Sequence, residues 1–372
     1  MTKRLISFKN TGKIDIAQPL RRLALFCVLI LLIITQTGCS SDSSQPVTGE
    51  NYYLDTVCTI SIYEITGEDG KAVPASDQEE AAGEVIKKAW DLCAGLEKKL
   101  SRTQDASEIS RLNHAGGEWT EVSSETAELI SEGIKYSELS GGEFDITIGG
   151  VTDLWDFHAD PEDAKVPDEE DLAEAVKHVD YHLIETDGNK VRIRDPETKI
   201  DLGGIAKGYI GDRMTELLEA EGVTSGIINL GGNVICIGAK DNDAEGDEGA
   251  FVIGVEAPFS DRSEIVGKVN AKDMTLVTSG VYERQIEVDG RRYHHILSTG
   301  TGYSVDTDLD AVTLTAEKGH SADLDALSTI CLIKGHEKAK ELIENTDGVE
   351  AVFILHDGTT DMTSGMAFEP EN

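Results

Sequence analysis

The chain has 372 residues, with 33 basic against 70 acidic side chains, and its formal net charge at pH 7 is −37. With 39% hydrophobic residues, 37 Gly and 8 Pro, its composition is that of a folded α/β or α+β protein, which excludes disordered and collagen-like chains. Six Cys in this length exclude a disulfide scaffold. Because so acidic a chain repels phosphate backbones, we expect no nucleic-acid partner.

The N-terminal residues 1–38 differ from the rest in charge and hydropathy. They carry six basic side chains against one acidic side chain, Asp15, and contain the apolar run Leu23–Ile34. A basic head followed by an apolar run too short to span a bilayer is typical of a signal peptide. We therefore expect residues 1–38 to direct export.

The segment Thr37-Gly38-Cys39-Ser40 resembles a bacterial lipobox, although Gln36 stands where a lipobox usually has Leu. We expect a lipid on Cys39 that anchors the protein to the bacterial membrane, facing outside the cytoplasm. An ordinary signal peptide and an uncleaved N-terminal anchor are the alternatives. The polar residues 39–50 are expected to form a flexible tether, followed by one large domain over residues 51–372.

Hydrophobic periodicity predicts the elements of this domain. Strands are expected at Val57–Tyr63, Lys190–Ile193, Lys199–Leu202, Ile227–Leu230, Val234–Ile237, Val252–Val255, Val312–Ala316 and Ala351–Leu355. Helices are expected at Thr126–Leu139, Asp168–Val179 and Ser321–Ile333, and in a segment whose apolar positions run from Ala82 to Leu100 with Asp77 and Glu79-Glu80 at its start. A loop is expected to lead into a helix over Gly204–Leu218, and a polar helix to end near Asn345.

Turn residues complete this prediction. Ser123 or Ser124 is expected to cap the second helix, and Gly141-Gly142 to end it. Asp289-Gly290 between two alternating segments predicts a β-hairpin over Arg284–Ile296. Because strands and helices do not alternate regularly and hairpins are frequent, we predict an α+β fold with antiparallel or mixed sheets and packed helices.

Asp325 and Thr329 are four residues apart in the helical segment Ser321–Ile333, so both lie on one face of that helix. A carboxylate and a hydroxyl are hard oxygen ligands, which Mg²⁺ prefers and completes with phosphates and water. In the alternative interpretation, Asp325 is a helix-terminal carboxylate and Thr329 hydrogen-bonds back to a carbonyl.

The segment Asp201–Gly208 reads as a strand that passes through paired glycines into a helix start carrying Lys207. Backbone N–H groups and an ammonium at such a junction can bind a pyrophosphate. The segment matches neither the phosphate-binding loop of nucleotide hydrolases nor the glycine pattern of dinucleotide folds. A purely structural turn is the alternative.

His294 and His295 are adjacent in the second strand of the expected hairpin, so their rings point to opposite faces. At most one of them can line a site. An imidazole with a pKa near neutral can accept a proton from an attacking hydroxyl. A lone His is more often structural, so this assignment needs further support.

Several motifs, in their order and spacing, resemble the ApbE family, the FAD:protein FMN transferases, over about residues 52–357. The matching segments are Asp55-Thr56 (Gly-Thr in the family), Leu100–Asn113, Gly142–Gly149, Leu154–Phe157, Asp201–Tyr209, Asn229–Asn233, Thr278–Arg284 and Leu324–Thr329. Two places depart from the pattern. Thr103 stands for an aromatic residue, and Ser298-Thr299 replaces an Asp-Pro pair, which predicts a more flexible loop without a carboxylate beside His295.

The resemblance implies Mg²⁺-dependent transfer of FMN from FAD to a Ser or Thr hydroxyl of a partner protein, with release of AMP. His295 would accept the proton, and Mg²⁺ would be bound by Asp325, Thr329 and the backbone carbonyl of Gly204. The implied contacts to the flavin nucleotide are Leu54, Thr103, Glu143, Phe144, Asp145, Asp201, Lys207 and Leu297.

The resemblance also implies partners, namely flavin-carrying subunits of membrane redox complexes or related extracytoplasmic flavoproteins. Two other functions remain open. An FAD pyrophosphatase would use water in place of the hydroxyl and yield FMN and AMP. A non-enzymatic flavin-binding lipoprotein would not need the metal ligands.

Overall fold

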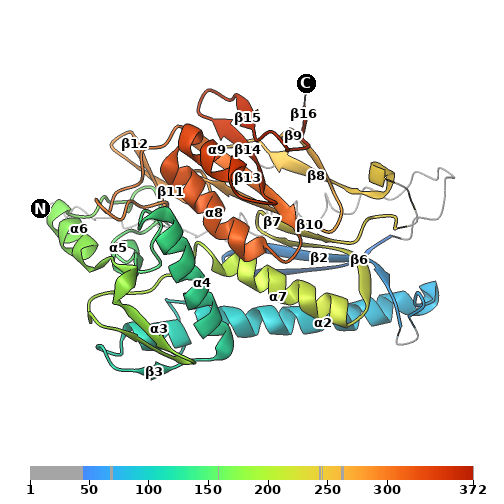
Figure 1. Cartoon of the computed structure of the whole chain (residues 1–372), viewed down its shortest axis with the longest axis horizontal. Coiled ribbons are helices and arrows are strands. Elements are labelled where there is room, and N and C mark those ends of the chain that lie inside the picture. The colour runs from blue at the N-terminus through green and yellow to red at the C-terminus, as the bar shows by residue number, and fades with distance from the viewer. Residues whose placement is uncertain are drawn as a thin grey trace, which may run out of the picture. The chain divides into compact units, whose positions relative to one another are not determined.

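The computed structural model of this chain describes residues 45–67, 70–157, 159–242, 244, 246–260 and 264–371 (Figure 1). The expected signal peptide, Cys39 and residues 39–44 of the tether lie outside these residues. Within the described ranges, no helix has both the length and the apolar character needed to cross a bilayer.

The centre of the fold is an eight-stranded sheet in the order β1-β2-β6-β7-β10-β13-β14-β15. Every neighbouring pair in it is antiparallel. The strands are β1 (Val47–Tyr53), β2 (Thr56–Ile65), β6 (Val223–Leu230), β7 (Asn233–Ile237), β10 (Met274–Gly280), β13 (Leu309–Glu317), β14 (Glu350–Leu355) and β15 (Thr360–Met362).

Three small antiparallel sheets accompany the large one. The first has the order β16-β9-β8, the second β3-β5-β4, and the third is the hairpin β11-β12. Their strands are β3 (Thr120–Glu121), β4 (Ile184–Asp187), β5 (Lys190–Ile193), β8 (Phe251–Glu256), β9 (Ile265–Ala271), β11 (Gln285–Val288), β12 (Arg291–His294) and β16 (Glu369–Pro370).

The described residues form α-helices of between four and 26 residues. They are α2 (Ala75–Leu100), α3 (Glu108–Asn113), α4 (Ser124–Ser140), α5 (Gly149–Thr152), α6 (Glu169–Ala175), α7 (Ala206–Ala220), α8 (Ser321–Lys334) and α9 (His336–Glu344). Short 3₁₀ turns occupy Val176–His178, Tyr181–Leu183 and Gly246–Gly249.

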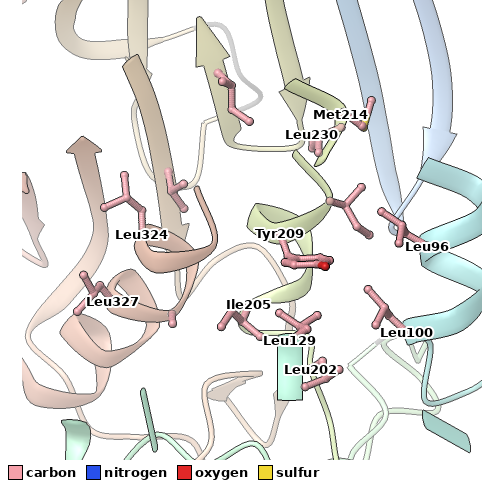
Figure 2. Close-up of a cluster of buried hydrophobic side chains, with 14 of the residues drawn as sticks. Leu96, Leu100, Leu129, Leu202, Ile205, Tyr209, Met214, Leu230, Leu324 and Leu327 are labelled. Carbon is pink, nitrogen blue, oxygen red and sulfur yellow. The ribbon is translucent and has the colours of Figure 1, made fainter. Parts of the chain in front are cut away.

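The large sheet is covered on both faces. Helices α2, α7 and α8 pack next to one another on one face (Figure 1), and their apolar side chains form the main core with those of the strands. Figure 2 shows Tyr209 of α7 between Leu96 of α2 and Leu324 of α8 in this core. On the other face, a second core joins the sheet to β8 and β9. These layers confirm the predicted α+β class.

Helix α7 crosses the start of α8 at very short range. A Cβ atom placed on Gly208 would lie 2.1 Å from the carbonyl oxygen of Ser321, so no other residue fits there without a shift of the backbone. In the same place Asp212 of α7 accepts the N–H groups of Ser321 and Ala322 at 3.0 and 2.9 Å. The crossing fixes the position of α8 relative to the N-terminus of α7.

Most predicted elements are found close to their predicted bounds. Helix α4 has Ser123 as its N-cap and Gly141, with φ of 72°, as its C-cap. The hairpin β11–β12 turns at Asp289-Gly290, where both residues have positive φ. Helix α2 begins at Ala75 and has Asp77 in its first turn, close to the predicted acidic start.

The predicted boundary of the tether at residue 50 is wrong, because Val47–Glu50 belong to β1 and pair with β2. This segment is polar and contains a glycine, so it resembles a linker in sequence. Gly49 has a packing role, since a Cβ atom there would lie 2.6 Å from Cγ2 of Ile86 on α2. The large sheet therefore begins before the predicted domain start.

The predicted strand Lys199–Leu202 is also wrong. Only Lys199 forms a bridge, a parallel one to Ile148. The side-chain amide of Asn113 uses the backbone of Ile200 instead: its Nδ2 donates to the Ile200 carbonyl at 2.9 Å, and its Oδ1 accepts the Ile200 N–H at 2.8 Å. A side chain thus takes the hydrogen bonds that a neighbouring strand would have made.

Candidate active site

A cavity of about 680 Å³ lies where the β1–β2 turn, the end of α2, the start of α7 and the middle of α8 meet. Every residue that the sequence predicts for catalysis, nucleotide binding or metal binding lines it. They are Leu54, Thr103, Glu143, Phe144, Asp145, Asp201, Gly204, Lys207, His295, Leu297, Asp325 and Thr329. The fold therefore brings together residues separated by up to 275 positions in the sequence.

Asp325 lies on α8, and its side chain is only 3% exposed. Its Oδ2 accepts the N–H of Gly208 at 3.0 Å. Within the described residues, Oδ1 has no hydrogen-bond partner and Asp325 forms no ion pair. A buried carboxylate without a cation is costly, so this environment favours binding of a positive ion from the cavity.

Thr329, one turn further along α8, completes the pair of oxygens that the helical spacing predicts. Its hydroxyl donates to the backbone carbonyl of Asp325 at 3.3 Å, so the back-bonding of the alternative interpretation is present. That contact leaves the oxygen lone pairs available as ligands. A Cβ atom on Gly204 would lie 3.7 Å from the Thr329 hydroxyl, so the backbone of Gly204 adjoins the same place.

These three groups fit a Mg²⁺ ion. All are oxygen donors, and one of them is a buried carboxylate with an oxygen unpaired by the described residues. No group of three or more His, Cys, Asp or Glu side chains in the described ranges could hold a metal ion. A Mg²⁺ ion here would therefore take several of its ligands from water or from the phosphates of a substrate.

The Gly203-Gly204 turn is held by Asp201. Oδ1 of this carboxylate accepts the N–H of Gly203 at 2.9 Å, and Oδ2 lies 3.0 Å from Nε of Arg102. Arg102 also pairs with Asp153. Asp201 thus links the end of α2 to the segment that enters α7.

Lys207 lies in the first turn of α7 and lines the cavity. It makes no hydrogen bond or ion pair with any residue that the structure describes. Its ammonium and the N-terminal end of the helix add positive potential to a cavity that also contains acidic side chains. This is the combination that the sequence predicts for binding a pyrophosphate.

His295 lines the cavity, and His294 does not. The ring nitrogen Nδ1 of His295 lies 3.3 Å from the carbonyl oxygen of Arg284, so we assign its proton to Nδ1 and the lone pair to Nε2. Burial and the positive charge of Arg284 lower the pKa of His295 to about 3. The ring is therefore neutral at physiological pH and able to accept a proton at Nε2.

The remaining nucleotide-binding residues differ in how their side chains are engaged. Phe144 is largely buried, and Glu143 pairs with Lys334 of α8. Asp145 is already bonded through both oxygens: Oδ1 accepts the N–H and hydroxyl of Thr147 at 2.8 and 2.6 Å, and Oδ2 accepts the N–H of Tyr181 at 2.9 Å. Burial raises the pKa of Asp145.

The loop that departs from the Asp-Pro pattern is tied to its surroundings. The Ser298 N–H donates to the Tyr303 carbonyl at 2.8 Å, and the Thr299 hydroxyl donates to the Gly142 carbonyl at 2.9 Å. The Gly302 N–H donates back to the Ser298 carbonyl, also at 2.8 Å. These contacts supply restraints on the loop that its sequence does not indicate.

Charged residues that were not among the predicted site residues also line the cavity, namely Asp55, Glu97, Arg102, Asp156, Glu283 and Arg284. All of them except Glu97 lie inside segments that match family motifs, which is the signal that could have found them. Glu97 precedes its motif by three residues, and its role depends on a contact to a turn 43 residues away.

The model of the ApbE family matches residues 54–353 of this chain. The chain belongs to the ApbE family. A relative named FAD:protein FMN transferase from Treponema pallidum is 32% identical over 324 residues, covering 84% of this chain and 85% of the relative. A protein of the same name from Klebsiella pneumoniae is 31% identical, covering 72% of this chain and 81% of the relative.

Solved structures of ApbE proteins share the fold. The crystal structure of the ApbE protein from Thermotoga maritima is 29% identical, with a TM-score of 0.74, over 86% of this chain and 97% of that chain. The apo form of the flavinyl transferase ApbE from Pseudomonas stutzeri is 28% identical, with a TM-score of 0.70, over 87% and 97%. The family match over residues 54–353 includes every predicted site residue that lines the cavity.

Proposed function

We propose that this chain is a flavin transferase that moves FMN from FAD to a Ser or Thr hydroxyl of a partner protein and releases AMP. Membership of the ApbE family, and relatives named FAD:protein FMN transferase, support transfer of flavin to protein. Dependence on a metal ion is inferred from one observation: the buried Asp325 carboxylate lies beside Thr329 and Gly204 in the cavity.

The reaction forms one P–O bond and breaks another. The acceptor hydroxyl oxygen attacks the phosphorus on the FMN side of FAD, and the bond from that phosphorus to the bridging oxygen breaks. The hydroxyl proton goes to Nε2 of His295, and AMP leaves with the bridging oxygen. Lys207 and the start of α7 would attract the pyrophosphate.

A Mg²⁺ ion held by Asp325, Thr329 and the Gly204 carbonyl would neutralise negative charge that develops on the phosphates. Around it, the chain supplies orientation. The Gly208 N–H fixes Asp325, and Asp201 fixes the turn that carries Gly204.

The variant Asp325→Asn tests the metal assignment. Asn keeps an oxygen that can accept the Gly208 N–H, so the fold should persist, but the negative charge is lost. We expect Mg²⁺-dependent release of AMP from FAD to fall by about 10²-fold or more. AMP is measured by chromatography across a Mg²⁺ titration.

Asp323→Asn is the matched control, because Asp323 lies on the same helix, bonds Tyr136 and His320, and does not line the cavity. Its AMP release should stay close to that of the wild type. Undiminished turnover in Asp325→Asn would refute the metal assignment.

We also propose that the protein is exported and anchored by a lipid on Cys39, and that its acceptors are extracytoplasmic flavoproteins or subunits of membrane redox complexes. The basic head, the apolar run and the Gly38-Cys39 pair in the sequence support this. Cys39→Ser should release the protein from the membrane fraction. A membrane-bound form that begins at Met1 and carries no lipid would contradict the anchor.

A further inference from the structure

The turn between β1 and β2 is strained. Strand β1 ends at Tyr53 and β2 begins at Thr56, so the turn consists of Leu54 and Asp55, with φ of 54° and 59°. Two-residue turns of this hand favour Asn and Gly, because a side chain in the left-handed region meets its own backbone. Asp tolerates this conformation better than Leu, which has no polar atom to bond locally.

The carboxylate of Glu97, on α2, hydrogen-bonds to the backbone of this turn. Oε1 of Glu97 accepts the N–H of Leu54 at 2.7 Å, a short contact of the charge-assisted kind. Glu97 lies in the last turn of α2, which packs against β1, and it forms no ion pair with any described residue. Its carboxylate is therefore engaged with the backbone of the turn and with no side-chain cation in that part of the chain.

The turn forms one wall of the cavity, since Tyr52, Leu54 and Asp55 all line it. The ion pair between Asp55 and Arg284 is long, at 3.8 Å, and exposed, so it restrains the turn little. The hydrogen bond from the Leu54 N–H to Glu97 ties the backbone of this wall to the helix layer, where the ring of Tyr53 also contacts that of Trp90.

We propose that Glu97 is a positioning residue for the nucleotide: by holding the left-handed Leu54-Asp55 turn, it keeps Leu54 in place against bound FAD. This inference rests on the proposed function, because it takes FAD as the ligand. Glu97 acts through the backbone of Leu54 and takes no part in the transfer of the proton or the phosphoryl group.

Three variants separate this role from others. Glu97→Leu removes the acceptor, and Glu97→Gln keeps an oxygen for the Leu54 N–H but removes the charge. Glu84→Leu is the matched control, because Glu84 is an exposed residue of the same helix that contacts neither the turn nor the cavity. If Glu97→Leu does not fold, Glu97→Asp replaces it, since its side chain is one methylene too short for this contact.

FAD binding is measured by quenching of flavin fluorescence in EDTA, where metal-dependent turnover cannot occur. We expect Glu97→Leu to bind FAD about tenfold more weakly and Glu97→Gln to stay within about twofold of the wild type. Glu84→Leu should bind as the wild type does. In transfer assays the KM for FAD should rise in Glu97→Leu while kcat changes little.

A second substitution tests whether Glu97→Leu weakens FAD binding by disturbing the Leu54-Asp55 turn. Asp55→Gly removes the strain at one turn position, where the resemblance places Gly in the family. Combined with Glu97→Leu, it should restore FAD affinity to within about threefold of the wild type. Absence of this rescue, or equal loss in Glu97→Gln and Glu97→Leu, would overturn the positioning role.

The outcomes distinguish this inference from the proposed function. A wild-type protein that binds FAD and transfers FMN, together with an unaffected Glu97→Leu, overturns the inference alone. A wild-type protein that neither binds FAD nor releases AMP from it in the presence of Mg²⁺ overturns the proposed function and the inference with it.

Discussion

The surroundings of His295 determine its pKa and which of its ring nitrogens can accept a proton. Burial first, and the charge of Arg284 second, lower its pKa to about 3, so the ring does not gain a proton in the physiological range. The Arg284 carbonyl holds Nδ1, which leaves Nε2 as the acceptor. His295 lines the cavity, and desolvation there lowers a pKa that an imidazole in water has near neutral.

The pH dependence of transfer follows from this pKa. The neutral ring is the active form, so its fraction falls only as the pH drops toward 3. We expect the transfer rate to show no loss from His295 protonation between pH 8 and pH 5. The measurement is the rate of covalent flavin formation at saturating FAD, acceptor and Mg²⁺ across this range.

His295→Ala provides the reference for that profile, and its transfer should be about 10²-fold slower or more at every pH in the range. A wild-type rate that falls with an apparent pKa near 6.5, where His295→Ala shows no such fall, would contradict the assignment of a depressed pKa.

Helix α8 carries the candidate metal ligands, and Asp212 of α7 caps its start through the N–H groups of Ser321 and Ala322. Burial raises the pKa of Asp212 to about 6 from the ordinary 3.8. The folded protein therefore binds a proton more tightly than the unfolded chain. The stability that this proton confers is present below about pH 4 and is lost as the pH rises through 6.

The variant Asp212→Asn should remove this pH dependence while keeping an oxygen that caps α8. We expect the free energy of unfolding of the wild type, relative to Asp212→Asn, to decrease by up to about 3 kcal/mol between pH 4 and pH 7. Urea unfolding of both proteins at several pH values measures it. A difference that stays constant with pH would show that Asp212 has no raised pKa.

The crossing of α7 and α8 gives a second prediction at the same place. In Gly208→Ala the new methyl group would lie 2.1 Å from the Ser321 carbonyl oxygen, so the helices must separate. We expect a loss of about 2–4 kcal/mol in the free energy of unfolding. Since the Gly208 N–H also bonds Asp325, FAD turnover should fall as well.

Gly83→Ala is the control for that change, because Gly83 lies in α2 with no atom within 4 Å of the position of a new Cβ. Alanine favours a helix over glycine, so this variant should be more stable by roughly 0.5–1 kcal/mol. Equal effects of the two substitutions would refute the close crossing.

Many of the residues that line the cavity could be predicted from the sequence, because motif residues such as Asp201, Lys207 and Asp325 keep the order and spacing of the family pattern. The class of fold followed from irregular alternation of strands and helices and from turn signals such as Asp289-Gly290. Amphipathic helices, including α4, were found because one face is buried in the core.

Other features depend on contacts between distant segments and leave no local pattern. β1 is polar and becomes a strand only through pairing with β2. Asn113 replaces strand pairing at Ile200, 87 residues away, so the expected strand there does not form. The contact of Glu97 with Leu54 likewise cannot be predicted from the sequence of either segment alone.

The cavity of this very acidic chain contains cationic side chains as well as acidic ones. The net charge is −37, yet the cavity contains Arg102, Lys207 and Arg284, and Asp201 is paired with Arg102. Lys207 is left without a partner among the described residues. Lys207, in the first turn of α7, is thus a cation available to contact a phosphate in a cavity that acidic side chains also line.

Transfer of FMN from FAD to a protein hydroxyl is tested by incubating the purified full-length protein in detergent with FAD, Mg²⁺ and a candidate acceptor domain. Covalent flavin on the acceptor is measured by in-gel fluorescence and mass spectrometry. We predict one FMN group on a Ser or Thr side chain, one AMP released for each flavin attached, and loss of both products in Asp325→Asn. Release of AMP together with free FMN, with no covalent flavin on any acceptor tested, would contradict it and favour a pyrophosphatase.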